Sequence, residues 1–266
     1  MNKRIGFIGC GNMGKSMVMG LLKSKSIGNE DILVSTRSNE SKEKIEEEIG
    51  VKCTLNNVEV AKFSDIIFLA VKPNMYKNVI FEIKDNLKDN AVIITIAAGI
   101  ELKQVETWFG KDIKIIKTMP NTPALVGEGM SAICPNKLVK EEELNYVCNL
   151  YKSFGEYEIL AEKDFHGFIA LCGSSPAYVF MFIEAMADAA VKLGIPRSKA
   201  YKMAAQSVLG SAKMVLETKK HPGELKDMVC SPGGTTIDAV VELENQGFRN
   251  SVIKGMEKCA EKSKSM

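Results

Sequence analysis

Three glycines near the start of the chain have the spacing of a dinucleotide-binding loop. They lie in the segment 9–14, Gly-Cys-Gly-Asn-Met-Gly, directly after an apolar run and before a helical pattern. In such a loop the first glycine allows a tight turn, the second lets the backbone approach a pyrophosphate, and the third lets helix and strand pack closely. The N–H groups that open the helix then face the phosphates. The segment predicts that the N-terminal half binds a nicotinamide dinucleotide.

The residues expected near the adenosine ribose lack a carboxylate. An NAD-specific protein usually carries Asp or Glu about 20 residues after the glycine motif, whereas this chain has Ser35, Thr36 and Arg37 there. Hydroxyls beside an arginine can hydrogen-bond and charge-pair with a 2′-phosphate. The sequence therefore favours NADPH, with NADH possible. The alternative is that Arg37 is an ordinary solvated surface residue.

Two further loops follow apolar runs, at positions where open α/β sheets bind ligands. One is the segment 70–74, Ala-Val-Lys-Pro-Asn, and the other is 97–99, Ala-Ala-Gly. Small residues there would let the nicotinamide half of the cofactor lie against the backbone. Lys72 has an alternative interpretation as a simple charge at the start of a helix.

A Pro-Gly-Gly turn in the C-terminal half also has the composition of a binding site. Residues 231–236 read Ser-Pro-Gly-Gly-Thr-Thr and lead into a helical pattern whose cap would be Thr235 or a neighbour. The first N–H groups of that helix could hold an anion such as a carboxylate. The alternative is a helix-capping turn in which the glycines serve only the sharp geometry.

Short β-branched runs alternate with amphipathic stretches as far as about Leu160, the pattern of a parallel sheet covered by helices. Residues 66–71 and 92–96 are apolar without alternation, which is typical of strands buried on both faces. We expect an α/β fold with a Rossmann-type parallel-sheet domain at 1–161 and an all-helical dimerisation domain at 162–266. The strands are expected at residues 4–8, 32–36, 51–54, 65–71, 91–96, 113–117, 130–134 and 157–160.

The second half contains only helical patterns, at residues 165–193, 198–217, 235–245 and 248–264. The first of these is too apolar around its circumference for a helix that faces solvent. We expect it to be buried against a second subunit, because about 100 helical residues have a limited interior of their own. The alternative is burial inside a single monomer core.

Composition restricts the partners. The 35 Lys and Arg nearly balance 33 Asp and Glu, and the net charge of +2 gives no field that would recruit nucleic acid or an anionic membrane. No apolar run approaches the roughly 20 residues of a membrane span, so we expect a cytoplasmic protein. The seven cysteines are scattered without a Cys-x-x-Cys pair, which predicts reduced packing residues and no metal site. His166 and His221 are expected to be structural.

Over almost its whole length the sequence resembles the Δ1-pyrroline-5-carboxylate reductases. The resemblance implies reduction of the cyclic imine 1-pyrroline-5-carboxylate to L-proline, the last step of proline biosynthesis. It also implies a homodimer, sometimes assembled further, in which interlocked C-terminal helices complete each substrate pocket. The segments that carry it are 5–14, 68–73, 119–123 and above all 225–239, which looks like the family signature.

The family's site residues transfer to matching positions here. The resemblance implies that Ser231, Gly233 and Gly234 hold the substrate carboxylate, and that Thr236, with Thr235 beside it, hydrogen-bonds the ring nitrogen as the catalytic residue. A family glutamate matches Glu162. Together with the glycine loop, the predicted cofactor residues are Gly9, Cys10, Gly11, Asn12, Met13, Gly14, Ser35, Arg37, Asn57, Ala70, Val71, Lys72, Pro73, Ala97 and Ala98.

Ser175 stands where the family usually has glycine. We expect this departure from the family pattern to affect the turnover rate more than the type of reaction. Two alternative functions stay open. A β-hydroxyacid dehydrogenase would share the order of elements, but such enzymes generally use a lysine in the first long helix of the second domain, and residues 165–190 contain none. A non-catalytic NADP-binding protein would bind cofactor without turnover.

Overall fold

The computed structural model describes residues 3–265, which form two compact units. The first unit comprises the chain up to Gly173 together with the residues from Ala260 onward, and the second comprises Ser174–Cys259. The functional boundary expected between residues 161 and 162 stays a prediction.

The first unit is built on one eight-stranded sheet with the order β3-β2-β1-β4-β5-β6-β7-β8. All the predicted strands are present, with ends shifted by a few residues. They are β1 Ile5–Ile8, β2 Ile32–Ser35, β3 Lys52–Thr54, β4 Ile66–Leu69, β5 Val92–Thr95, β6 Lys114–Met119, β7 Gly129–Pro135 and β8 Gly155–Ile159.

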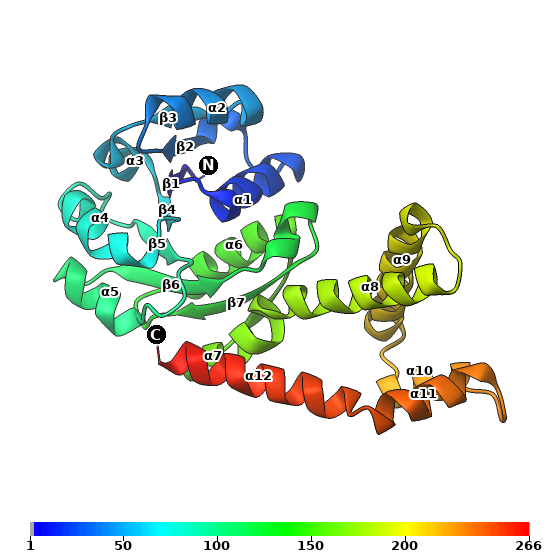
Figure 1. Cartoon of the computed structure of the whole chain (residues 1–266). Helices are drawn as coiled ribbons and strands as arrows, with labels where there is room; N and C mark the ends of the chain where they lie inside the picture. The colour runs from blue at the N-terminus through cyan, green and yellow to red at the C-terminus, as the bar shows by residue number, and fades with distance from the viewer. Residues whose placement is uncertain (1–2, 266) are drawn as a thin grey trace. The chain divides into compact units, whose positions relative to one another are not determined.

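Helices cover both faces of this sheet (Figure 1). Successive strand residues point to opposite faces, so in β1 Phe7 packs in one core cluster and Ile8 in the other. This explains why the strands are apolar without alternation. The first cluster includes residues of α1 Asn12–Lys23, α2 Asn39–Ile49 and α6 Glu141–Tyr151, and the second includes residues of α3 Asn57–Phe63, α4 Tyr76–Ile83 and α5 Leu102–Phe109.

The sequence pattern predicted a parallel sheet, but the sheet is not parallel throughout. Strand β7 runs antiparallel to β6. Only residues 120–128 join the two strands, and they contain no more than a 3-10 turn, η3 Thr122–Val126. A parallel connection needs a crossover of about a dozen residues or more, usually a helix. The longer link through α6 then makes β8 parallel to β7.

The strand order creates a ligand site at the start of the chain. After β1 the chain adds β2 and β3 on one side and then returns to add β4 and β5 on the other. Ligands of open α/β sheets bind at the carboxyl ends of the strands where this reversal occurs. The glycine loop follows β1 at that point.

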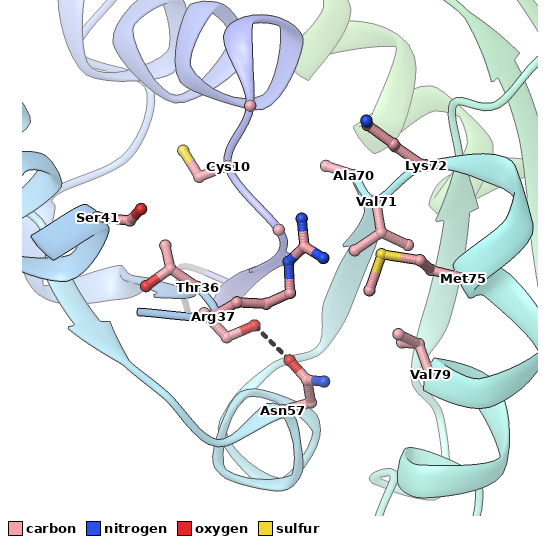
Figure 2. A pocket seen from close by; sticks show the side chains of 13 residues that line it. Cys10, Thr36, Arg37, Ser41, Asn57, Ala70, Val71, Lys72, Met75 and Val79 are labelled. Carbon is pink, nitrogen blue, oxygen red and sulfur yellow. Dashed lines mark hydrogen bonds between the residues drawn. The ribbon is translucent and has the colours of Figure 1, made fainter. Parts of the chain in front are cut away.

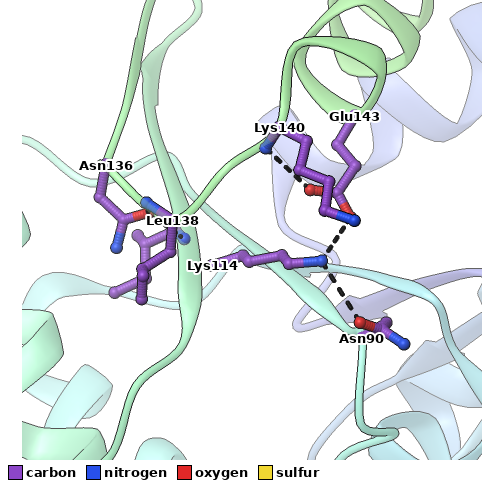
Figure 3. Close-up of polar contacts among 7 residues, drawn as sticks. Asn90, Lys114, Asn136, Leu138, Lys140 and Glu143 are labelled. Atoms are coloured by element: carbon purple, nitrogen blue, oxygen red, sulfur yellow. Dashed lines mark hydrogen bonds and ion pairs between the residues drawn. The ribbon is translucent and has the colours of Figure 1, made fainter.

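A largely buried ion pair joins α6 to the start of β6 (Figure 3). Lys114 Nζ lies 2.6 Å from Glu143 Oε1, and the backbone N–H of Lys140 donates to Glu143 Oε2 at 3.0 Å. Burial acts to raise the pKa of Glu143, but these two hydrogen bonds, together with the positive charges of Lys114 and Lys3, outweigh it and hold the pKa below its ordinary value. The carboxylate is therefore stabilised in its charged form.

The second unit is entirely helical. Its helices are α8 Ser175–Lys192, α9 Arg197–Thr218, α10 Pro222–Val229, α11 Thr235–Asn245 and most of α12 Phe248–Lys264. The helix predicted over 165–193 is interrupted: α7 Phe165–Phe168 passes into a π-helical turn, η6 Ile169–Gly173, and α8 begins afresh. Pro176 lies in the first turn of α8. A proline has no N–H to continue a preceding helix, but it is well tolerated at a helix start.

The apolar side chains of α8 are not buried within the chain. Among its described residues only Ala187 is buried, while Phe180 is 63% and Met181 69% exposed. An apolar groove of about 420 Å³ lies between α8 and α9. Within one chain, α8 is therefore not buried in a core. This agrees with the expectation that α8 packs against a second subunit.

One helical stretch, Glu162–Lys192, is long and apolar enough to cross a membrane by length and composition, with a mean hydropathy of 1.5. The expectation that no apolar run approaches the length of a membrane span is wrong for this stretch. Occasional polar residues lower the average hydropathy only slightly. The helix break after Phe168 falls inside this stretch.

Candidate active site

The glycine loop has the backbone geometry that its spacing predicts. Gly9 has a φ of +86°, and a Cβ atom there would lie 2.8 Å from the carbonyl oxygen of Ala70, so the turn requires glycine. A Cβ on Gly14 would lie 3.3 Å from Ala70 Cβ, which shows the close packing of α1 on the sheet. Around Gly11 a Cβ would meet no described atom within 4 Å. Gly11 thus faces open space at the start of α1.

The N-terminus of α1 offers free donors to a ligand in that space. Gly11 is the N-cap residue and has no side chain to cap the helix. The first N–H groups of a helix have no partner within it, and the positive end of the helix dipole lies there. This arrangement fits the pyrophosphate of a dinucleotide.

A cavity of about 280 Å³ opens beside the loop (Figure 2). Nine predicted cofactor residues line it: Gly9, Cys10, Gly11, Ser35, Arg37, Asn57, Ala70, Val71 and Lys72. Figure 2 shows the Arg37 side chain reaching into the middle of the cavity, with Cys10 on one side and Val71 on the other. The residues come from the ends of β1, β2 and β4 and from the start of α3, the edge at which the strand order reverses.

Three lining residues were missed by the sequence analysis: Ser41, Met75 and Val79. Thr36, which also lines the cavity, was expected near the ribose but was not included among the predicted cofactor residues. Thr36 stands between two predicted residues. Ser41 lies in the first turn of α2, where Ser38 caps the helix. Met75 is the N-cap of α4 and Val79 lies four residues later within the helix, a spacing that places both on one helical face. This four-residue spacing, shortly after Lys72-Pro73, was the sequence feature from which both residues could have been predicted.

Six predicted cofactor residues do not line this cavity. Asn12, Met13 and Gly14 form the first turn of α1, and Pro73 begins a short 3-10 turn. Ala97 and Ala98 follow β5 and pack in two core clusters. Their contacts with the cofactor stay predictions.

The charge of the cavity suits a phosphorylated ligand. Arg37 and Lys72 line it, and of the lining residues that the structure describes none is acidic. Burial, with a smaller contribution from Cys53, raises the pKa of the Cys10 thiol to about 12. Cys10 is therefore neutral near pH 7 and is no nucleophile there.

A second cavity of about 320 Å³ is lined by Glu162 and by Gly99, the last residue of the predicted nicotinamide loop 97–99. Glu162 Oε1 accepts from Lys117 Nζ at 2.9 Å and from the N–H of Leu102 at 2.8 Å. Lys117 also lies 5.0 Å from the centre of the Phe165 ring. The predicted substrate contact is thus already paired with a buried lysine and with the start of α5.

The two histidines have structural contacts. His166 Nδ1 lies 3.0 Å from the hydroxyl of Ser263, so it joins α7 to the end of α12. His221 Nδ1 accepts from the N–H of Gly223 at 3.0 Å and caps α10. Both contacts agree with the structural roles expected for these residues.

The Pro-Gly-Gly turn of the second unit presents an open helix start. Gly234 donates its N–H to the carbonyl of Ser231 at 3.0 Å, and Gly233 has a φ of +68°. Gly234 is the N-cap of α11, and no side chain among the described residues caps this helix. The N–H groups of Thr235 and Thr236 belong to its first turn and are available to an anion.

Two known families match parts of the chain. Residues 162–266 match the pyrroline-5-carboxylate reductase dimerisation family. Residues 4–99 match the family described as NADP oxidoreductase coenzyme F420-dependent. The α/β half followed by a helical dimerisation domain agrees with the predicted fold.

Relatives and solved structures of one activity match the whole chain. The pyrroline-5-carboxylate reductase of Escherichia coli is 53% identical over 266 residues, covering 100% of this chain and 99% of that protein. A solved reductase from Coxiella burnetii has a TM-score of 0.93 at 34% identity, covering 100% of this chain and 98% of that one. The Plasmodium falciparum reductase, solved with NADP bound, has a TM-score of 0.89 at 34% identity, covering 99% and 98%. The chain therefore belongs to the pyrroline-5-carboxylate reductase family.

Proposed function

We propose that this chain reduces 1-pyrroline-5-carboxylate to L-proline with NADPH, the last step of proline biosynthesis. The observation that carries the proposal is the 53% identity along the whole chain to a reductase of that name. The cationic cavity beside an uncapped helix start gives it a physical basis.

We place the phosphate-bearing half of the cofactor in the first cavity. The N–H groups at the start of α1, from Asn12 to Gly14, bind the pyrophosphate. Arg37 binds the 2′-phosphate, and Ser35 and Asn57 lie beside the ribose. Lys72 adds positive charge, and the loops at 70–73 and 97–98 lie beside the nicotinamide.

The substrate carboxylate is assigned to the turn before α11. Ser231, Gly233, Gly234 and Thr235 surround the open helix start, where a negative charge is stabilised by N–H donors and by the helix dipole. Thr236, one position farther along, holds the ring nitrogen. Glu162 is a further substrate contact in this proposal.

The reaction needs placement more than acid–base chemistry. When bound, NADPH would supply the hydride for C5 of the protonated imine, whose C=N electron pair would pass to the nitrogen to give the amine. The Thr236 hydroxyl accepts a hydrogen bond from the ring N–H and fixes the orientation of the ring. Holding both reactants in near-attack geometry then supplies most of the acceleration. Neither histidine takes part.

The test is oxidation of NADPH by purified protein, followed at the NADPH absorbance band with 1-pyrroline-5-carboxylate. Thr236→Ala should lower kcat by roughly ten- to hundredfold, the worth of one hydrogen bond to a charged group. Thr236→Ser should retain activity, since it keeps the hydroxyl. Full turnover by the alanine variant contradicts the role of Thr236. Cofactor binding without any turnover favours the non-catalytic alternative.

We further infer a cytoplasmic homodimer, with assembly of dimers into larger particles, and no nucleic-acid or membrane partner. The exposed apolar face of α8 supports the dimer. All seven cysteines are unpaired in the described residues, as is usual in a reducing compartment. Light scattering after gel filtration measures the assembly, and cell fractionation measures the location.

A further inference from the structure

Three side chains form a hydrogen-bonded chain at the ribose end of the first cavity. Ser35 Oγ lies 2.7 Å from Asn57 Oδ1, the bond dashed in Figure 2. Asn57 Nδ2 in turn lies 2.8 Å from Glu82 Oε2. Ser35 ends β2, Asn57 begins α3, and Glu82 belongs to α4. Ser35 and Asn57 line the cavity, whereas Glu82 is not among the lining residues that the structure describes.

The carboxylate at one end fixes the direction of every hydrogen bond in this chain. A carboxylate only accepts, so the NH2 group of Asn57 must face Glu82 and its oxygen must face Ser35. The single hydroxyl proton of Ser35 is then donated to Asn57. Toward a ligand in the cavity, Ser35 can only accept a hydrogen bond.

An acceptor at this position distinguishes the two nicotinamide cofactors. The 2′-hydroxyl of NADH has a proton to donate to Ser35 Oγ. The 2′-phosphate of NADPH carries almost two negative charges at pH 7 and offers acceptors only. Donors for that phosphate come from other lining residues, Arg37 and Ser41. Ser41 Oγ accepts from Ser38 Oγ at 3.0 Å, which leaves the Ser41 proton for a ligand.

We propose that Glu82 is a positioning residue that sets cofactor preference through Asn57 and Ser35. By keeping Ser35 an acceptor, it maintains binding of NADH beside NADPH. The inference rests on the proposed placement of the adenosine ribose in this cavity.

The decisive variant is Glu82→Gln. A glutamine can donate to Asn57 Oδ1, so the Asn57 amide can turn its NH2 group toward Ser35 and release the serine proton for the phosphate. The ratio of the dissociation constants, NADH over NADPH, should rise roughly three- to tenfold, the worth of about one hydrogen bond. Fluorescence titration of the full-length protein with each cofactor measures the ratio. Glu82 is exposed, so the variant should fold.

The hydrogen-bonded chain from Glu82 through Asn57 to Ser35 is called the relay below. Loss of a negative charge near the cavity could by itself raise the ratio of the NADH and NADPH dissociation constants, without the relay. Two variants separate these causes. Asp85→Asn makes the same charge change just beyond α4 and should leave the ratio unchanged. In an Asn57→Ala background the relay is absent, so adding Glu82→Gln should then have no effect. An equal effect of Glu82→Gln with and without Asn57 would overturn the proposal, as would an unchanged ratio in the single variant.

A third measurement separates failure of the relay from failure of the cofactor placement. Adenosine 2′,5′-bisphosphate is titrated calorimetrically into the protein and into Arg37→Ala. If Arg37→Ala does not weaken binding, the ribose lies elsewhere and the proposed cofactor site fails with the relay. If Arg37→Ala weakens binding while Glu82→Gln leaves the NADH to NADPH ratio unchanged, only the role of Glu82 is overturned.

Discussion

Lys117 Nζ and the N–H of Leu102 share one oxygen, Glu162 Oε1, at 2.9 and 2.8 Å. The Lys117 side chain is 8% exposed and that of Glu162 is 32% exposed. One carboxylate thus connects strand β6, the start of α5 and the segment that leads into α7. A residue matched to a family substrate contact therefore also has a structural function in this chain.

Replacing Lys117 should reveal how much this structural function of Glu162 contributes to stability. In Lys117→Met the Glu162 carboxylate loses its countercharge, and the free energy of unfolding should fall by about 1–2 kcal/mol, because Glu162 is partly solvated. Urea denaturation measures the loss. Lys163→Met, at an exposed neighbour lining the same cavity, is the control. Equal stability of both variants would show that the ion pair contributes nothing.

Arg37→Ala should separate the two cofactors. The guanidinium pairs with a 2′-phosphate that NADH lacks, so the dissociation constant of NADPH should rise roughly ten- to hundredfold. That of NADH should stay unchanged. Lys44→Ala removes an exposed cation from α2, outside the cavity lining, and serves as the control. A weakening of both cofactors alike would assign Arg37 to their shared part.

Phe180→Asp should give monomers. Phe180 is 63% exposed on α8 of the dimerisation domain, and a charge buried in an apolar interface lacks a partner. Phe81→Asp makes the same change at a phenylalanine of the first unit that is 48% exposed, and should leave the dimer intact. Light scattering gives both masses. A dimer of unchanged mass in Phe180→Asp would place the interface elsewhere.

Glu143→Gln should lower stability in a pH-dependent way. The folded pKa of Glu143 lies below its ordinary 4.5, so its stabilising effect is complete above about that pH and is lost as the pH falls through the folded pKa. Near pH 7 the variant should be less stable by about 2 kcal/mol, the cost of a hydrogen bond to a charged group. Below pH 4 the difference should shrink. Glu142→Gln, at an exposed neighbour, should show no such dependence.

The sequence predicts the sheet and the glycine loop well, because both depend on local patterns. Strands buried on both faces must be apolar at every position, as in β4, and the Gly9 turn leaves room for no other residue. The start of α11 at Thr235 follows from the glycines before it. These features need no knowledge of distant contacts.

Features that depend on distant contacts were less predictable. Strand β7 is antiparallel because its connection to β6 is short. An apolar strand pattern in the sequence does not indicate the direction in which the strand runs. Met75 and Val79 line the cavity only because α4 packs beside β1 and β4 through Ile80 and its neighbours. Likewise, the pairing of Glu162 with Lys117 joins residues 45 positions apart in sequence.

The chain leaves the first unit after Gly173 and rejoins it at Ala260. Ser263, on this returning segment, supplies the partner of His166. During synthesis the first unit therefore cannot be completed until the segment that begins at Ala260 has been made. A chain cut after residue 173 would therefore lack the segment that supplies Ser263 to His166.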